Sequence, residues 1–251
     1  MSSGSATRED RQAKAAAMRA QAAKAEARRR MLIVTGAVLA VLLLGIGVFV
    51  VVQNARRETV AADAATPGNL GPSNSIVVGD ASAPVTLVTY EDFQCPVCNE
   101  FEQLNTTQID AWVKAGTVKV DYRPVSILDR ASEDNYSTRS LNAVAALVNS
   151  TPSAFPAYHK ALFAEQPAEN GPGLTDQRLI DLAVTAGAPK AAMTTAVKNL
   201  TYKSWTVRAT EQASKDGLTG TPRVLVNGTE VKEPTAANLK AAVDAAVAAA
   251  K

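Results

Sequence analysis

The sequence predicts an α/β domain that follows one N-terminal transmembrane helix, and three observations support this prediction. An uncharged run of 22 residues, 31–52, lies near the N-terminus. Further along, two strand-like segments flank a helical pattern, and a long helical block separates them from a β-hairpin and a final helix. The 26 basic and 24 acidic residues leave a net charge of +2, which gives no reason to expect a nucleic-acid partner.

The charged arm and the uncharged run together predict a membrane anchor and its orientation. Residues 1–30 hold eight basic and three acidic residues, and the 22-residue run after them is long enough to span a hydrocarbon core of about 30 Å. A cleaved signal peptide is the alternative, but its apolar region usually has only about 7–15 residues. Positive residues stay on the cytoplasmic side. Arg28, Arg29 and Arg30 therefore predict a single-pass protein of the cell membrane, with a basic cytoplasmic arm and an extracytoplasmic domain.

A tether is expected between the anchor and the domain. Residues 53–75 show no apolar periodicity, and Pro67, Gly68, Gly71 and Pro72 interrupt any regular element. Such a composition is typical of a flexible linker that lets a folded domain stand away from the membrane.

The predicted domain, residues 76–251, begins with a strand and a helix. The β-branched, apolar run 84–90 is typical of a central strand. The helical pattern that follows starts at Cys95, continues to about Ala115 and ends at Gly116. The first helix is therefore expected to begin at a cysteine.

A second strand and a helical insertion are expected next. Val118, Val120 and Tyr122 alternate with polar residues, as in a half-exposed strand. From 133 to about 216 the patterns are helical throughout. Five helices are expected in this insertion. The first two lie near 135–149 and 153–165. The third begins at Thr175, and the last two follow Pro189 and Thr201.

The end of the domain is predicted to be a hairpin and a helix. Asn227 and Gly228 stand between two β-like runs, and this dipeptide is the strongest short-range hairpin signal. An Ala-rich helix is expected from about Thr235 onward. The order is therefore strand, helix, strand, helical block, hairpin and helix, which is an α/β fold.

The chain has two cysteines, Cys95 and Cys98, separated by Pro96 and Val97. A structural zinc ion usually needs four Cys or His ligands. The single histidine, His159, lies far along the chain and is expected to be a surface or packed helical residue, so no metal site is predicted. A purely structural disulfide is also disfavoured, because a loop closed across two residues restricts the unfolded chain very little.

A redox-active dithiol fits this spacing better. Pro96 falls in the first helical turn, where its missing N–H group costs nothing. The sulfur of Cys95 then faces unpaired N–H groups and the positive end of the helix, which favour the thiolate. Cys98 lies one turn later on the same face as Phe101, so it is expected to be buried and less reactive. The expected redox group is the Cys95–Cys98 disulfide itself, without a further cofactor.

Four features together resemble the thioredoxin-fold proteins of the DsbA type. They are the Cys-Pro-Val-Cys motif after a strand, the acidic residues Glu91 and Asp92 upstream of it, the helical block, and Thr221-Pro222 in "TGTPRVLVNG". The resemblance covers about residues 76–251. It implies a thioredoxin fold with a helical subdomain inserted at about 133–216.

The resemblance also implies roles for individual residues. Cys95 would be the attacking cysteine and Cys98 the resolving one. Thr221 and Pro222 would form a loop with a cis peptide bond that faces both cysteines. The backbone of that loop would pair with the backbone of an extended substrate. Such main-chain pairing does not depend on the substrate's side chains, so it suits many unfolded clients.

The sequence departs from the family pattern at two places. Many related oxidases have histidine where this chain has Val97, so its disulfide is expected to be less strongly oxidising. Many members also bury an acidic group where this chain has Thr89. Glu91 and Asp92 are the candidates for a proton relay to Cys98, and a plain solvated role for them is the alternative. Pro96 and Val97 are expected to modulate the thiols.

The function expected from these features is extracytoplasmic thiol-disulfide exchange. The protein would donate its Cys95–Cys98 disulfide to unfolded exported proteins with free thiols. A quinone-linked membrane partner would reoxidise it, and residues 31–52 would hold it in the membrane. Two alternatives stay open: a disulfide reductase or isomerase of the same fold, and a tethered, non-catalytic binding protein or chaperone.

Overall fold

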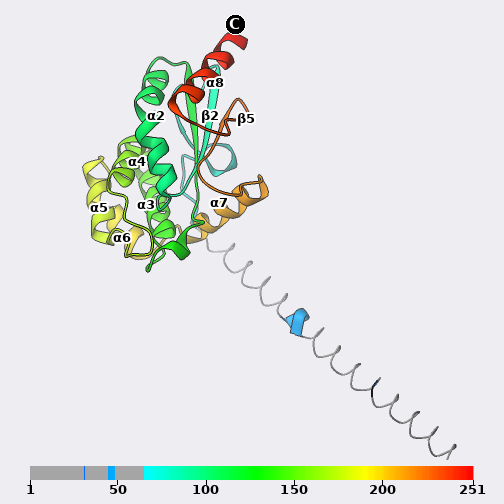
Figure 1. Cartoon of the computed structure of the whole chain (residues 1–251). Coiled ribbons are helices and arrows are strands. Elements are labelled where there is room, and N and C mark those ends of the chain that lie inside the picture. The colour runs from blue at the N-terminus through cyan, green and yellow to red at the C-terminus, as the bar shows by residue number, and fades with distance from the viewer. Residues whose placement is uncertain (1–30, 32–44, 49–64, 251) are drawn as a thin grey trace, which may run out of the picture. The chain divides into compact units, whose positions relative to one another are not determined.

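The structure is a computed structural model that describes Met31, residues 45–48 and residues 65–250. The chain divides into two compact units, 1–62 and 63–251. The second unit holds the α/β domain, whose strands and helices are labelled in Figure 1.

The predicted cytoplasmic arm, 1–30, lies outside the described residues. So does most of the predicted membrane segment, 31–52, of which Met31 and residues 45–48 are described and helical. Among the helices that the structure does describe, none has both the length and the apolar composition needed to cross a membrane.

The described part of the domain contains one five-stranded mixed sheet with the strand order β1-β3-β2-β4-β5. The central strand, β2, pairs in parallel with β3 and antiparallel with β4, while β1 and β5 are antiparallel edge strands. The bounds of the strands are β1 (Ile76–Val78), β2 (Val85–Glu91), β3 (Val118–Pro124), β4 (Arg223–Val226) and β5 (Thr229–Glu230).

Helices cover both faces of this sheet. The helices α2 (Pro96–Lys114) and α8 (Ala236–Ala249) pack on one face, where Leu87 of β2 lies between its register partners Val120 and Val226. The opposite face contacts α7 (Lys203–Lys215). Because α2 follows β2 directly, the N-terminus of α2 lies at the edge where the parallel strands end (Figure 1). The α/β prediction is confirmed.

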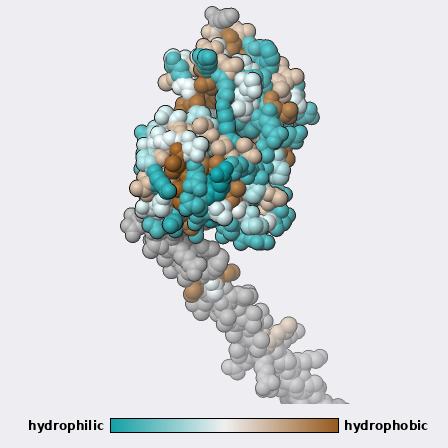
Figure 2. Space-filling view, turned by 90° about the vertical axis from the view of Figure 1, so that its left-hand side faces the viewer, coloured by the Kyte–Doolittle hydropathy of each residue, from teal (hydrophilic) through white to brown (hydrophobic). Residues whose placement is uncertain are grey.

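A helical subdomain is inserted between β3 and β4, as predicted. Its helices, followed by α7, are α3 (Tyr136–Ser150), α4 (Phe155–Ala164), α5 (Asp176–Thr185) and α6 (Lys190–Lys198). Helix α3 is almost entirely buried at the centre of its own apolar core. The predicted start at Thr175 is confirmed, because the Thr175 side chain accepts a hydrogen bond from the Arg178 N–H. The face shown in Figure 2 is mainly hydrophilic, with small separate hydrophobic areas, as expected of a solvated surface.

The predicted hairpin joins β4 to β5. Asn227 and Gly228 have φ angles of 45° and 82°, the left-handed conformation that a tight two-residue hairpin turn requires. The last helix also starts where expected, because Thr235 caps it by accepting a hydrogen bond from the Asn238 N–H.

Residues 65–75 differ from the flexible tether that the sequence predicts. The Gly68 N–H donates to the side chain of Asn149 on α3 at 2.9 Å, and Arg208 of α7 donates to Thr66 at 2.8 Å. Leu70 packs against the core of the helical subdomain. These contacts depend on tertiary packing, which the composition of a Pro- and Gly-rich segment does not reveal. Residues 53–64 of the predicted tether lie outside the described part.

Candidate active site

The two cysteines lie at the junction between β2 and α2. Cys95 is the N-cap residue of α2, with extended backbone angles (φ −76°, ψ 117°), and Pro96 opens the first helical turn. The Cys95 N–H donates to the Asp92 carbonyl at 2.9 Å, and its own carbonyl accepts from the Asn99 N–H at 3.2 Å. The turn before the helix is therefore held by main-chain hydrogen bonds, and it places the Cys95 sulfur at the helix N-terminus.

The two sulfurs have different surroundings, although both belong to one dithiol. Cys95 keeps 6% of its surface exposed, whereas Cys98 is completely buried. A hydrogen bond with the Cys98 thiol, helped by the N–H groups of Cys98 and Val97, lowers the pKa of Cys95 to about 6, although burial opposes this shift. Burial in turn raises the pKa of Cys98 far above its usual value. The Cys98 thiol thus contributes more to this shift than the helix N-terminus, which the sequence indicated as the main cause.

The Thr221-Pro222 loop faces Cys95 across the end of the helix. The Cys95 thiol lies 3.4 Å from the carbonyl oxygen of Thr221, to which it donates a hydrogen bond. The peptide bond between Thr221 and Pro222 is cis, as the resemblance implied. The two segments that the sequence singled out, 126 residues apart, are therefore in contact.

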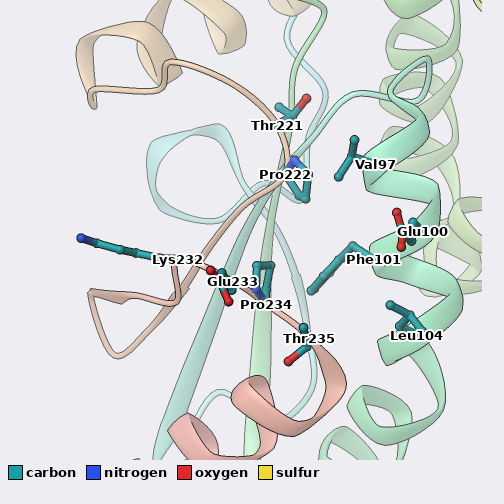
Figure 3. Close-up of a pocket in the computed structure, with 10 residues that line it drawn as sticks. All are labelled: Val97, Glu100, Phe101, Leu104, Thr221, Pro222, Lys232, Glu233, Pro234 and Thr235. Atoms are coloured by element: carbon teal, nitrogen blue, oxygen red, sulfur yellow. The ribbon is translucent and has the colours of Figure 1, made fainter.

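A groove of about 340 Å³ runs alongside this loop. One wall of the groove is formed by three residues of α2: Val97, Phe101 and Leu104. The opposite wall contains Pro222 and Pro234 (Figure 3). Val97 is 56% exposed at the end nearest Cys95, so the residue between the cysteines is a surface residue. Glu100, Lys232 and Glu233 add charge at the rim. The groove therefore offers apolar side chains, and the Thr221-Pro222 loop that lines it contacts the reactive sulfur.

The solvated role considered for Glu91 and Asp92 is wrong. Glu91, the last residue of β2, is 2% exposed, and Asp92, which follows it, is fully buried. Asp92 accepts hydrogen bonds from the Ser137 hydroxyl at 2.6 Å and from three backbone N–H groups, which lie 2.8–3.0 Å away. Those N–H groups belong to Gln94, Ile127 and Leu128. Asp92 therefore ties the turn before Cys95 to the loop after β3 and to α3.

Glu91 belongs to a buried cluster that the sequence did not reveal. His159 of α4 bonds to Glu91 through Nε2 at 2.9 Å, and its Nδ1 lies 3.8 Å from Glu102 of α2. Burial, followed by the charge of Glu102, raises the pKa of Glu91 to about 8. Burial lowers the pKa of His159, but Glu102 and Glu91 outweigh it and leave that pKa raised.

The location of this cluster was only partly accessible from sequence. Glu102 follows Cys98 by one helical turn, so the spacing on α2 could have identified it. His159 reaches Glu91 only because α4 packs beside α2, which no local pattern encodes. The ligand atoms of the three residues lie within 4.8 Å of one another, close enough for a metal ion, so the expectation of no metal site did not consider this group.

Comparisons with known proteins agree with this geometry. The family described as "Thioredoxin" matches residues 72–245. The crystal structure of oxidised DsbA from Mycobacterium tuberculosis is 31% identical in sequence and superposes with a TM-score of 0.59. The match covers 70% of this chain and 100% of the DsbA chain. Disulfide bond formation protein D of Bacillus subtilis is 26% identical over 181 residues, which are 70% of this chain and 78% of that protein.

A second curated relative is much longer than this chain. The serine/threonine-protein kinase PknE of Mycobacterium tuberculosis is 29% identical over 160 residues, or 61% of this chain. The match spans 28% of the kinase's length. The similarity is therefore to one part of that protein.

Proposed function

Because the chain belongs to the DsbA-like thiol-disulfide oxidoreductases of the thioredoxin family, we propose that it exchanges disulfides with exported proteins and mainly oxidises them. In this proposal Cys95 is the attacking cysteine and Cys98 the resolving one. The printed name of the Bacillus subtilis relative, a disulfide bond formation protein, supports the oxidising direction.

The asymmetry of the two thiols is the observation that carries this proposal. The pKa of Cys95 is lowered to about 6, whereas burial raises that of Cys98. A thiolate at Cys95 stabilises the reduced form near neutral pH, and a protein with a stabilised reduced form is an oxidant. The same thiolate is a good leaving group when a client thiol resolves the mixed disulfide.

The proposed reaction transfers two electrons from the client to the protein. A client thiolate attacks the Cys95 sulfur, the bond between Cys95 and Cys98 breaks, and its electron pair and a proton go to Cys98. A second client thiolate then attacks the client sulfur of the mixed disulfide, and Cys95 leaves as a thiolate. The client gains a disulfide and the protein becomes a dithiol.

The groove beside Pro222 is the proposed client site. Its apolar wall at Phe101 and Pro234 and the exposed Val97 suit an extended, unfolded segment. The backbone at Thr221 lies next to the Cys95 sulfur, where main-chain pairing would place a client thiol.

Two further features complete the proposal. Residues 31–52 anchor the protein with its N-terminus in the cytoplasm and its catalytic domain outside. A quinone-linked membrane partner accepts the two electrons and restores the disulfide. The uncharged run and the three arginines before it support this arrangement.

Assays on the full-length protein in detergent test the direction of exchange. The oxidised protein is expected to oxidise a reduced, unfolded client and to reduce insulin slowly. Rapid insulin reduction without client oxidation would instead indicate a reductase. Full function in a variant with both Cys95→Ser and Cys98→Ser would indicate a binding protein or chaperone.

A further inference from the structure

Two glutamines from distant parts of the chain meet beside the turn that leads into α2. Gln94 directly precedes Cys95, and Gln166 lies in the loop between α4 and α5 of the inserted helical subdomain. The Gln166 side chain donates through Nε2 to the carbonyl oxygens of Phe93 at 3.0 Å and Cys95 at 2.9 Å. These two carbonyls lie on either side of Gln94. The loop therefore holds the backbone from which the Cys95 sulfur projects.

The Gln94 side chain returns this contact. It is fully buried, and its Nε2 donates to the carbonyl oxygens of the two residues that follow Gln166. These residues are Pro167 at 3.4 Å and Ala168 at 3.2 Å. An amide NH2 group has two N–H donors, and a carbonyl oxygen can only accept, so each glutamine has one acceptor for each donor. Gln94 and Gln166 together form a reciprocal contact, the glutamine clamp.

The clamp supports the turn from the side of the loop, whereas Asp92 supports it from the other side. Asp92 accepts the Gln94 N–H at 2.9 Å and also binds the loop after β3 and the start of α3. The turn belongs neither to β2 nor to α2, so these contacts fix its backbone. A rotation of the Cys95 backbone would move its sulfur away from the Thr221 carbonyl, 3.4 Å away. The clamp therefore contributes to the position of the sulfur.

This support matters more for one redox form than for the other. In the disulfide form, the covalent bond to Cys98 holds the Cys95 sulfur beside the helix. In the dithiol form, which the structure describes, the position of that sulfur depends on the backbone of the turn. The groups that stabilise it, the Cys98 thiol and the N–H groups of the helix N-terminus, act only at short range. Loss of the clamp should therefore destabilise the dithiol form more than the disulfide form.

We propose that the inserted helical subdomain positions the Cys95 sulfur through the glutamine clamp, with Gln166 as a positioning residue that stabilises the dithiol form over the disulfide form. This inference rests on the disulfide exchange proposed above. A protein whose dithiol form is stabilised is a stronger oxidant. The subdomain thus contributes to the oxidising strength of the cysteines, although neither cysteine belongs to it.

The equilibrium of the full-length protein with a glutathione buffer tests the proposal. Gln166→Met removes both donors, keeps a side chain of similar length and adds no charge. Gln166 is half-buried and lies outside the helices, so the variant is expected to fold. We expect its equilibrium to move toward the disulfide by about threefold to tenfold, as the loss of one or two ordinary hydrogen bonds would give. An unchanged equilibrium constant would overturn the proposal.

Urea unfolding of both redox forms separates positioning from plain structural support. Gln166→Met should lower the free energy of unfolding of the dithiol form more than that of the disulfide form. Equal losses in the two forms would make Gln166 a structural residue only. The matched control is Gln177→Met on α5, because Gln177 is exposed and donates to Asp181 of its own helix at 2.8 Å. This control should leave the glutathione equilibrium as in the wild type, and an equal shift in it would also overturn the proposal.

A double variant tests whether the two glutamines act as a unit. Gln94→Met should shift the glutathione equilibrium in the same direction, and the double variant should shift it by less than the product of the two single shifts. Shifts that multiply would reject the reciprocal clamp. If Gln94→Met does not fold, the measurements on Gln166→Met decide the proposal. A wild-type protein that forms no disulfide in any glutathione buffer would reject the proposed disulfide exchange itself, whereas an unchanged equilibrium in Gln166→Met would reject the clamp alone.

Discussion

On one side of the α2 N-terminus, Cys95 faces the Thr221-Pro222 loop and an open groove; on the other side, Cys98 faces the core. The groove side presents a low-pKa sulfur, apolar side chains and the Thr221-Pro222 loop. The core side holds the ionisable groups Glu91 and His159, sealed by aromatic rings. One helical turn thus separates a sulfur next to a surface groove from a sulfur that is buried in the core.

The largest effect is expected from exchanging each sulfur for oxygen. Cys95→Ser should reduce client oxidation to the uncatalysed background, because without the Cys95 sulfur there is no disulfide for a client thiolate to attack. Cys98→Ser should also stop turnover, but it should accumulate mixed disulfides at Cys95, since nothing resolves them. Each variant is incubated first with a reduced client and then with an oxidised client. Mass spectrometry of the protein after these incubations distinguishes the two variants. Mixed disulfides at Cys98 in the Cys95→Ser variant would reverse the assignment of the two sides.

A smaller effect is expected from Asp92, which holds the core side together. Asp92→Ala leaves the Ser137 hydroxyl and three backbone N–H groups without their acceptor. Each buried donor left unpaired costs about 1–3 kcal/mol, so the free energy of unfolding should fall by about 3 kcal/mol or more. Urea unfolding followed by tryptophan fluorescence measures the loss.

The matched control for Asp92→Ala is Asp244→Ala on α8, where the acid is 58% exposed in an ion pair with Lys240. Exposed pairs of this kind contribute about 0–1 kcal/mol. Similar losses in the two variants would show that Asp92 does not organise the turn before Cys95.

The smallest effect is expected on the groove side, at Val97. A histidine at this exposed position would place an imidazole beside the Cys95 thiolate and stabilise it. We expect Val97→His to lower the pKa of Cys95 further and to shift the equilibrium with glutathione toward the dithiol by about tenfold. Val97→Gln is the polar, uncharged control, and equal equilibrium constants for both variants would mean that Val97 does not limit the oxidising strength.

Much of the fold follows from local signals. The Asn227-Gly228 turn, the Thr175 and Thr235 caps and the end of the first helix at Gly116 each depend on a few adjacent residues, and the structure has each where the sequence predicts it. The contact between Cys95 and Thr221 followed from family resemblance, because no local pattern joins positions 126 residues apart.

Other features required the packed structure. Strand β1, Ile76–Val78, was not predicted because its three residues form a strand only by pairing with β3. The burial of Glu91 and its bond to His159 depend on how α4 packs against α2. Sequence reasoning thus located the sulfurs and named Glu91 as a candidate, but it did not reveal that Glu91 is buried against His159.

The asymmetry of the two thiols is tested most directly by titrating the reduced full-length protein and following thiolate absorbance in the ultraviolet. One thiolate should form with a midpoint near pH 6, and Cys98→Ala, which removes the hydrogen-bond donor, should raise that midpoint, because the Cys98 thiol is the main group that lowers the pKa of Cys95. The second thiol should stay protonated beyond the ordinary thiol value of 9.0. Two thiols that ionise together near that value would contradict the account.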